Sequence, residues 1–263
     1  MKMPVNKLNA LTNNLLYEGD FINLNVLNTF GIFILKNCFN KSLISKYLSF
    51  YHSYKNSSDF DRNDKHLTEV RITDGNSLLN ILSEPNFHKI SLNLFPEGAG
   101  IYNIRIVKKD STDMNPVFLH QDVGYQYGSF ERYSIFIPLT KCSKLNGGLT
   151  FIPGSHHFGY LGDAGAIKNS IIPKDLIQIT PTVIPGDIII MNSFTWHKSG
   201  FNSEGSERVY FDIHLNKSSD PASKYLINTD DFREYSLDYT NDNIFENSRL
   251  QRLNNFASKY DQT

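Results

Sequence analysis

One stretch decides how this chain is interpreted: Phe118-Leu119-His120-Gln121-Asp122-Val123-Gly124-Tyr125. We interpret it as the end of a β-strand, where side chains at positions i and i+2 point to the same side. His120 and Asp122 are therefore expected to reach one small ion together. Alone this motif is weak, because a chain with eight histidines often contains a His-x-Asp pair by chance. A metal site needs a third ligand from elsewhere in the sequence.

Length and composition exclude several classes of protein. The 263 residues are enough for one large domain with a buried core. The net charge of −1 and the pI near 6.7 argue against general binding to nucleic acid or to anionic membranes. No apolar run approaches the ~18 residues of a membrane span, and no signal-peptide core follows Met1. With Cys38 and Cys142 expected as reduced thiols, we predict a soluble, cytoplasmic protein.

The first hundred residues are expected to be mainly helical and irregular. Apolar residues between Leu43 and Tyr51 recur at helical spacing, and Ser42 can cap that helix. The predicted segments are a loose lead-in at 1–27, a strand at 30–35, this helix, a surface loop at 53–75 and a short helix at 77–82 that stops near Pro85.

From residue 100 the hydrophobic period becomes two, which is typical of strands. The predicted strands are 101–107, 117–120, 133–139, 149–152, 177–183, 187–193 and 208–215. Many short strands with turns between them indicate a sandwich, jelly roll or barrel. The tail after Lys217 is polar, with one helical stretch at 244–256. We expect a single domain over 1–263, mainly β with flanking helices, whose β core spans about 100–216.

A third ligand is offered by His197, which ends the strand that begins at Asp187. Arg208 follows eleven residues later and opens the next strand, so we expect it to be strand-paired beside His197. Alternation puts Arg208, Tyr210, Asp212 and His214 on one face, and Val209, Phe211, Ile213 and Leu215 on the other. An arginine at the head of a buried polar face is unfavourable unless an anion meets it.

Two histidines and one carboxylate form the facial triad of non-haem iron sites, which leaves three positions open on Fe(II). A bidentate 2-oxoacid takes two of these positions, and O₂ can take the third. The far carboxylate of the 2-oxoacid then needs a fixed cation, and the guanidinium fork of Arg208 suits it. Among the other histidines, His156 can either line a substrate entrance or cap its own turn, and His214 is expected in the core.

These motifs resemble the phytanoyl-CoA dioxygenase (PhyH-like) family of Fe(II)/2-oxoglutarate oxygenases. The resemblance covers roughly residues 100 to 216. The segments that carry it are His120-Gln121-Asp122, Asn146-Gly147-Gly148-Leu149-Thr150-Phe151-Ile152-Pro153-Gly154-Ser155-His156, Pro185-Gly186-Asp187-Ile188-Ile189-Ile190, Trp196-His197-Lys198-Ser199-Gly200 and Arg208.

The resemblance implies a double-stranded β-helix (a cupin-like jelly roll) and assigns roles to individual residues. It implies that His120, Asp122 and His197 bind iron, and that Arg208 and Ser199 hold the distal carboxylate of 2-oxoglutarate. Phe136 falls at an aromatic wall beside the co-substrate, whereas Asn103 either touches 2-oxoglutarate or packs in the core. Candidate substrate residues, with surface aromatics as the alternative for the tyrosines, are Tyr102, Gln121, Tyr125, Tyr127 and His156.

The implied reaction is hydroxylation of a small polar metabolite with Fe(II), 2-oxoglutarate and O₂, releasing succinate and CO₂. Asp122 stands where halogenating relatives carry a small residue, which favours hydroxylation over halogenation. One alternative is a cupin-like isomerase or epimerase, but it leaves Arg208 without a role. Another is a catalytically silent jelly roll that binds a small ligand. The sequence leaves open whether the chain is a monomer or a homodimer.

Overall fold

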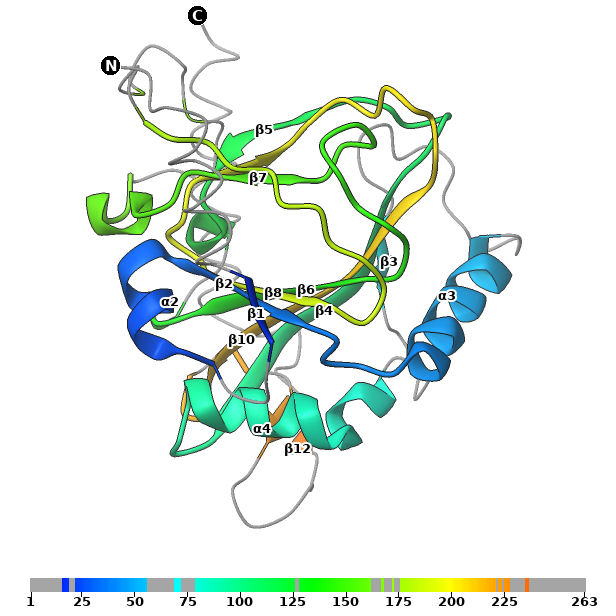
Figure 1. Cartoon of the computed structure of the whole chain (residues 1–263). Helices are drawn as coiled ribbons and strands as arrows, with labels where there is room; N and C mark the ends of the chain where they lie inside the picture. The colour runs from blue at the N-terminus through cyan, green and yellow to red at the C-terminus, as the bar shows by residue number, and fades with distance from the viewer. Residues whose placement is uncertain are drawn as a thin grey trace, which may run out of the picture.

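Two β-sheets face each other, and helices cover the outside of the larger one (Figure 1). The predicted mainly-β fold with flanking helices is confirmed, and the facing sheets form the jelly roll. The structure, a computed structural model, describes residues 16–18, 22–55, 69–71, 79–125, 128–161, 167, 172, 176–220, 222–223, 225–227 and 235–236.

The larger sheet is antiparallel except for the pairing of its first two strands. In spatial order it contains β1 (Leu16–Glu18), β2 (Ile32–Lys36), β8 (Ile188–Asn192), β6 (Tyr133–Pro138), β10 (Arg208–Lys217), β4 (Ala99–Lys109), β11 (Tyr225–Ile227) and β12 (Tyr235–Ser236), while β3 (Glu69–Arg71) also pairs with β4. The smaller sheet has the order β5 (Val117–His120), β9 (His197–Ser199) and β7 (Leu149–Phe151).

The central strand β10 has two different faces, as its sequence predicts. Its apolar face packs into a core beneath α3 (Lys41–Lys55) and α4 (Pro85–Leu94), where the rings of Tyr47 and Phe211 lie 4.9 Å apart. Its other face looks toward the smaller sheet (Figure 1). Because neighbouring side chains of a strand alternate in direction, one strand serves both the core and the cavity.

Two helices were not predicted from the sequence. α2 (Leu24–Phe30) begins where the Asn23 side chain accepts a hydrogen bond from the Val26 N–H, and it ends at Gly31, whose φ is 73°. Proline fits the first position of a helix, where its missing N–H is not needed. Pro85 therefore starts α4, after a separate 3₁₀ turn, η1 (Leu79–Ser83), in place of the predicted helix.

The predicted strand at 177–183 is wrong. Ile179 and Val183 form only isolated bridges, to Phe151 and Cys142 respectively. Pro181 lies between them and has no N–H to donate, so it interrupts a regular ladder.

The loop predicted at 53–75 is shorter than expected where the structure describes it. α3 continues to Lys55, and β3 pairs with β4. The predicted helix at 244–256 lies outside the described residues. Among the described segments, no helix combines the length and apolar character that crossing a membrane requires.

Candidate metal centre

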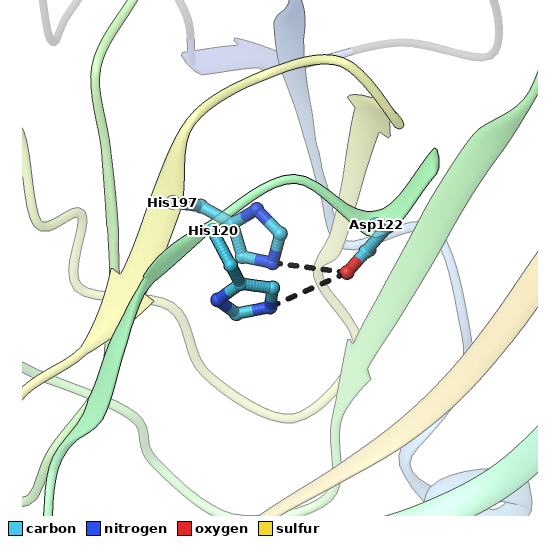
Figure 2. Close-up of side chains that lie close together, drawn as sticks. All are labelled: His120, Asp122 and His197. Carbon is cyan, nitrogen blue, oxygen red and sulfur yellow. Dashed lines mark ion pairs between the residues drawn. The ribbon is translucent and has the colours of Figure 1, made fainter. Parts of the chain in front are cut away.

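The three predicted metal ligands lie together at one end of the smaller sheet (Figure 2). His120 ends β5 and is the register partner of His197, which begins β9. The chain leaves the strand after His120, and Asp122 starts the 3₁₀ turn η2 (Asp122–Tyr125). Asp122 Oδ1 lies 3.4 Å from Nε2 of each imidazole. The candidate ligand atoms all lie within 4.8 Å of one another, which is close enough to bind one ion.

Backbone hydrogen bonds orient both imidazoles. Nδ1 of His120 lies 2.7 Å from the Phe118 carbonyl oxygen, and Nδ1 of His197 lies 3.0 Å from that of Thr195. A carbonyl can only accept a hydrogen bond, so Nδ1 carries the proton in each ring. Each Nε2 faces Asp122, and in the neutral ring this nitrogen carries the lone pair with which histidine binds a metal.

Asp122 is held as a carboxylate. Its Oδ2 accepts a hydrogen bond of 2.6 Å from the Ser134 hydroxyl on β6. Burial alone would raise the pKa of Asp122, but His197 and His120 hold that pKa well below its usual value. Burial would likewise lower the pKa of His197, and the Asp122 carboxylate raises it instead. Two imidazole nitrogens and one ionised oxygen are a donor set that suits Fe(II).

A cavity lies between the sheets, and the three candidate ligands share its wall with Arg208, Ser199 and Phe136. The Arg208 side chain is only 1% exposed. Its Nε and Nη2 have no hydrogen-bond partner among the described residues, and neither has Ser199 Oγ. A buried cation is stable only when charge and hydrogen bonds compensate it. This end of the cavity therefore fits the carboxylate of a bound anion.

Arg208 is not strand-paired beside His197, which corrects the prediction from sequence. β9 belongs to the smaller sheet and β10 to the larger one, because the turn between them crosses from sheet to sheet. The metal ligands and Arg208 therefore approach the cavity from opposite sheets. A ligand with two ends can lie between them.

The other residues predicted beside the co-substrate lie on the inner face of the larger sheet. The Phe136 ring has its centroid 6.4 Å from that of His197. Asn103 is the register partner of His214 on this face. A β-bulge next to it leaves Tyr102 without a register partner on β10. The Tyr102 hydroxyl lies 3.3 Å from Nδ1 of His214. Phe136 thus lies in the cavity wall, while Asn103 and Tyr102 border the buried His214.

Two predicted substrate residues bond to backbone groups. The Gln121 amide donates to the carbonyls of Gly159 and Phe194, each at 2.8 Å. His156 Nε2 lies 2.8 Å from the Asn28 carbonyl oxygen on α2, so this contact joins the ring to a distant helix and does not cap its own turn. The Tyr125 side chain and all of Tyr127 lie outside the described residues. For all four, contact with a substrate stays a prediction.

Trp196 anchors the segment that carries His197. Its backbone N–H donates to Ser155 Oγ at 2.8 Å, and its carbonyl accepts from the Ile152 N–H at 3.0 Å. The indole is buried, and its ring centroid lies 5.3 Å from that of Phe158. This packing fixes the start of β9 and therefore the position of the His197 ring.

Sequence reasoning missed several residues of the site. Arg105 and Asp212 face each other across β4 and β10, line the cavity, and form an ion pair of 2.6 Å. Alternation had placed Asp212 on the polar face of its strand without a role, and the same period-two pattern along residues 101–107 could have identified Arg105. Ser134 carried no such signal, because its contact with Asp122 depends on how the strands fold together.

Comparison with known proteins agrees with the family resemblance of the motifs and with the observed fold. Residues 80–209 match the family model described as phytanoyl-CoA dioxygenase (PhyH). The non-heme α-ketoglutarate-dependent epimerase SnoN from nogalamycin biosynthesis has a similar structure, with a TM-score of 0.65 and 16% identity over 82% of this chain and 85% of its own.

Two further solved structures are similar. The carbocyclase SnoK from the same biosynthesis gives a TM-score of 0.64 at 14% identity, over 75% of this chain and 84% of its own. HygX from Streptomyces hygroscopicus was solved with nickel, 2-oxoglutarate and hygromycin B. It gives a TM-score of 0.57 at 11% identity, over 74% of this chain and 86% of its own. At such identities the likeness shows the fold alone. No curated protein sequence matches the chain.

Proposed function

We propose that this chain, an iron- and 2-oxoglutarate-dependent enzyme that belongs to the phytanoyl-CoA dioxygenase (PhyH) family, hydroxylates a small polar molecule. Succinate and CO₂ are the co-products. The observation that carries the proposal is the buried Arg208 guanidinium, which lies across one cavity from the three candidate ligands. Its Nε and Nη2 have no hydrogen-bond partner within the described part of the chain. A 2-oxoacid bound to the metal would bring its distal carboxylate to this cation.

Each residue has a part in the proposed reaction. His120, Asp122 and His197 would hold Fe(II) through two Nε2 atoms and one carboxylate oxygen. Bound Fe(II) would supply the activation of O₂ and the oxidising power. Arg208 and Ser199 would fix the distal carboxylate of 2-oxoglutarate by charge-assisted hydrogen bonds. The Phe136 ring would exclude water from that side of the cavity.

A charged wall supports a polar substrate. Arg105 and Asp212 line the same cavity as the metal ligands, although Asp212 is fully buried. His214 also bonds to Asp212, with 3.1 Å between His214 Nε2 and Asp212 Oδ2. A few convergent polar groups in a largely apolar pocket are what fix the orientation of a small ligand. The carboxylate at Asp122 favours hydroxylation over halogenation, because the protein itself fills the third ligand position.

The test begins with binding and ends with product. Anaerobic Fe(II) protein titrated with 2-oxoglutarate should develop the weak visible absorption of an iron–2-oxoacid chelate. Succinate release against a metabolite panel then identifies the substrate, and ¹⁸O₂ should label the product. The Asp122→Ala variant is the control and should show neither absorption nor turnover. Absence of the band in the wild type would refute the proposal, whereas succinate release without ¹⁸O in the product would exclude hydroxylation only.

A further inference from the structure

Lys109 is a fully buried lysine that the proposed reaction does not use. It ends β4 on the inner face of the larger sheet, where it is the register partner of Arg208. Its Nζ donates a hydrogen bond of 2.9 Å to the Gly200 carbonyl and another to the Asn115 carbonyl. The ammonium therefore reaches across the cavity end to the backbone of the smaller sheet.

These contacts involve all three strands of the smaller sheet at one end. Asn115 precedes β5 and Gly200 follows β9. Gly147, which precedes β7, has a φ of +76°, and a Cβ there would lie 2.9 Å from both Lys109 Cδ and the Gly200 oxygen. The glycine of the Asn-Gly-Gly motif thus leaves room for the lysine stem. One side chain from the larger sheet thus bonds to the segments that flank β5 and β9, and its stem lies beside the glycine that precedes β7.

The hydrogen bonds of Lys109 lie next to three paired residues that line the cavity. Ser199 is the register partner of Val117 on one side and of Leu149 on the other. All three line the cavity together with Arg208. A shift of the Gly200 backbone would move Ser199, which is its neighbour in the chain. The position of the Ser199 hydroxyl therefore depends on the contacts of Lys109.

The charge of Lys109 also acts on this end of the cavity. Burial and the Arg208 guanidinium lower the pKa of Lys109 to about 8, and Asp113 opposes them. Arg208 and Asp113 are the main charged groups that act on it. Two groups beside Arg208 stay neutral, because burial raises the pKa of Cys142 to about 12 and that of Tyr210 well above its usual value. Two adjacent buried cations favour an anion in the cavity.

We propose that Lys109 is a positioning residue for the distal carboxylate of 2-oxoglutarate. Its hydrogen bond to the Gly200 carbonyl fixes the backbone next to Ser199. Its positive charge adds to that of Arg208. The site would thereby prefer 2-oxoacids that carry a second carboxylate. This inference rests on the proposed function, because it assumes that the 2-oxo end of the same molecule binds the metal.

The test compares two ligands with the same chelating end. Calorimetry on the Ni(II)-loaded protein gives the Kd of 2-oxoglutarate and of 2-oxobutyrate, which lacks the distal carboxylate. Lys109→Met should weaken 2-oxoglutarate about tenfold and 2-oxobutyrate less than about twofold. Lys109→Arg should recover part of the loss, because it keeps the charge. An equal loss for both ligands would indicate a merely structural role and overturn the proposal.

Lys108 offers a matched control. It is also buried, but its Nζ donates to Asp110 Oδ2 at 3.0 Å, and its side chain is on the opposite side of β4. Lys108→Met should leave both Kd values unchanged. A selective loss of 2-oxoglutarate affinity in this variant would also contradict the proposal, since any buried lysine would then serve.

The wild-type protein gives a test that does not require a folded variant. Lys109 loses its charge as the pH rises past about 8. Affinity for 2-oxoglutarate should therefore fall between pH 7 and pH 9 more than affinity for 2-oxobutyrate, by a factor of about three to ten. Ionisation of water on the metal affects both ligands alike, so the ratio isolates the distal end. A constant ratio would overturn the proposal. If neither ligand binds the wild type, the proposed function itself fails.

Discussion

The two faces of β10 are built for opposite purposes, although they belong to the same ten residues. On the outer face Val209, Phe211, Ile213 and Leu215 are fully buried against the apolar residues beneath α3 and α4. On the inner face Arg208, Tyr210, Asp212 and His214 are almost as buried, but they are polar. The outer face stabilises the fold by removing apolar surface from water. The inner face keeps charges out of water: Asp212 pairs with Arg105, whereas Arg208 has no such ion pair among the described residues and needs a ligand to compensate it.

This difference teaches that burial alone does not identify a core. Phe211 and Arg208 are both almost inaccessible to solvent. The ring of Phe211 packs against apolar partners, while Nε and Nη2 of Arg208 find no acceptor in the segments that the structure describes. Changes on the outer face should therefore alter stability, and changes on the inner side should alter ligand binding. The predictions below separate the two, beginning with the largest effect.

Loss of a metal ligand should give the largest effect. His197→Ala removes one of two imidazoles, and metal-dependent succinate release should fall by about 10³-fold or more, beyond the 10–100-fold typical of groups behind the ligands. Succinate release is measured together with the metal content of the purified variant. Thermal unfolding of the metal-free protein shows whether the variant is still folded. If the variant bound Fe(II) as tightly as the wild type, the inner face would not be a metal site.

Phe211→Ala should reduce the free energy of unfolding by about 3–5 kcal/mol, because it opens a cavity in the outer core. The affinity of the molecules that remain folded for 2-oxoglutarate should not change. Denaturant unfolding and calorimetry measure the two quantities separately. A loss of affinity in the folded variant would show that the faces are coupled.

Arg208→Met should behave in the reverse way. It replaces a buried cation by an apolar side chain of similar length, so stability without ligand should be retained or increased. Affinity for 2-oxoglutarate should fall by about 100-fold, the equivalent of a charge-assisted hydrogen-bond pair. Calorimetry on the Ni(II)-loaded protein measures this loss. A variant with lowered stability and unchanged affinity for 2-oxoglutarate would overturn the distinction between the faces.

Ser199→Ala should produce a smaller loss, because it removes one neutral hydroxyl. Its Oγ has no partner among the described residues, so no internal hydrogen bond is lost. The Kd for 2-oxoglutarate should rise about fivefold, the value of about 1 kcal/mol for one hydrogen bond. The melting temperature without ligand should stay the same, which separates lost contact from lost structure.

The smallest effect concerns Glu207, which precedes β10. Burial would raise its pKa, but hydrogen bonds from His52 and Lys55 on α3 lower it. A lowered pKa in the folded state contributes stability above the ordinary carboxyl pKa, and this contribution disappears as the pH falls through the folded value. Glu207→Gln should therefore reduce stability at pH 7 by about 0.5 kcal/mol, because the pair is partly exposed. The difference from wild type should vanish at low pH in denaturant titrations.

The sequence predicted those parts of the molecule that depend on local patterns. Alternation along residues 208–215 identified both faces of β10, and the His-x-Asp motif with His197 identified the clustered side chains. Contacts between sheets carry no local signal. Arg208 was therefore expected beside His197 instead of opposite it, and the contact of Ser134 with Asp122 was missed.

Proline accounts for two errors in the predicted elements, and both follow from its missing backbone N–H. Pro85 starts α4, because a helix needs no N–H at its first position. Pro181 interrupts a predicted strand, because a ladder needs the N–H that it lacks. The missing N–H of proline is harmless at the start of a helix and disruptive within a β-ladder.

The buried position of Trp196 gives this protein a built-in optical reporter. It is the only tryptophan of the 263 residues, so all indole emission comes from the residue directly before His197. An open-shell metal ion bound at that imidazole would lie close enough to quench the excited indole, whereas a closed-shell ion would not. Occupancy of the site can therefore be followed in solution by light alone, without any label.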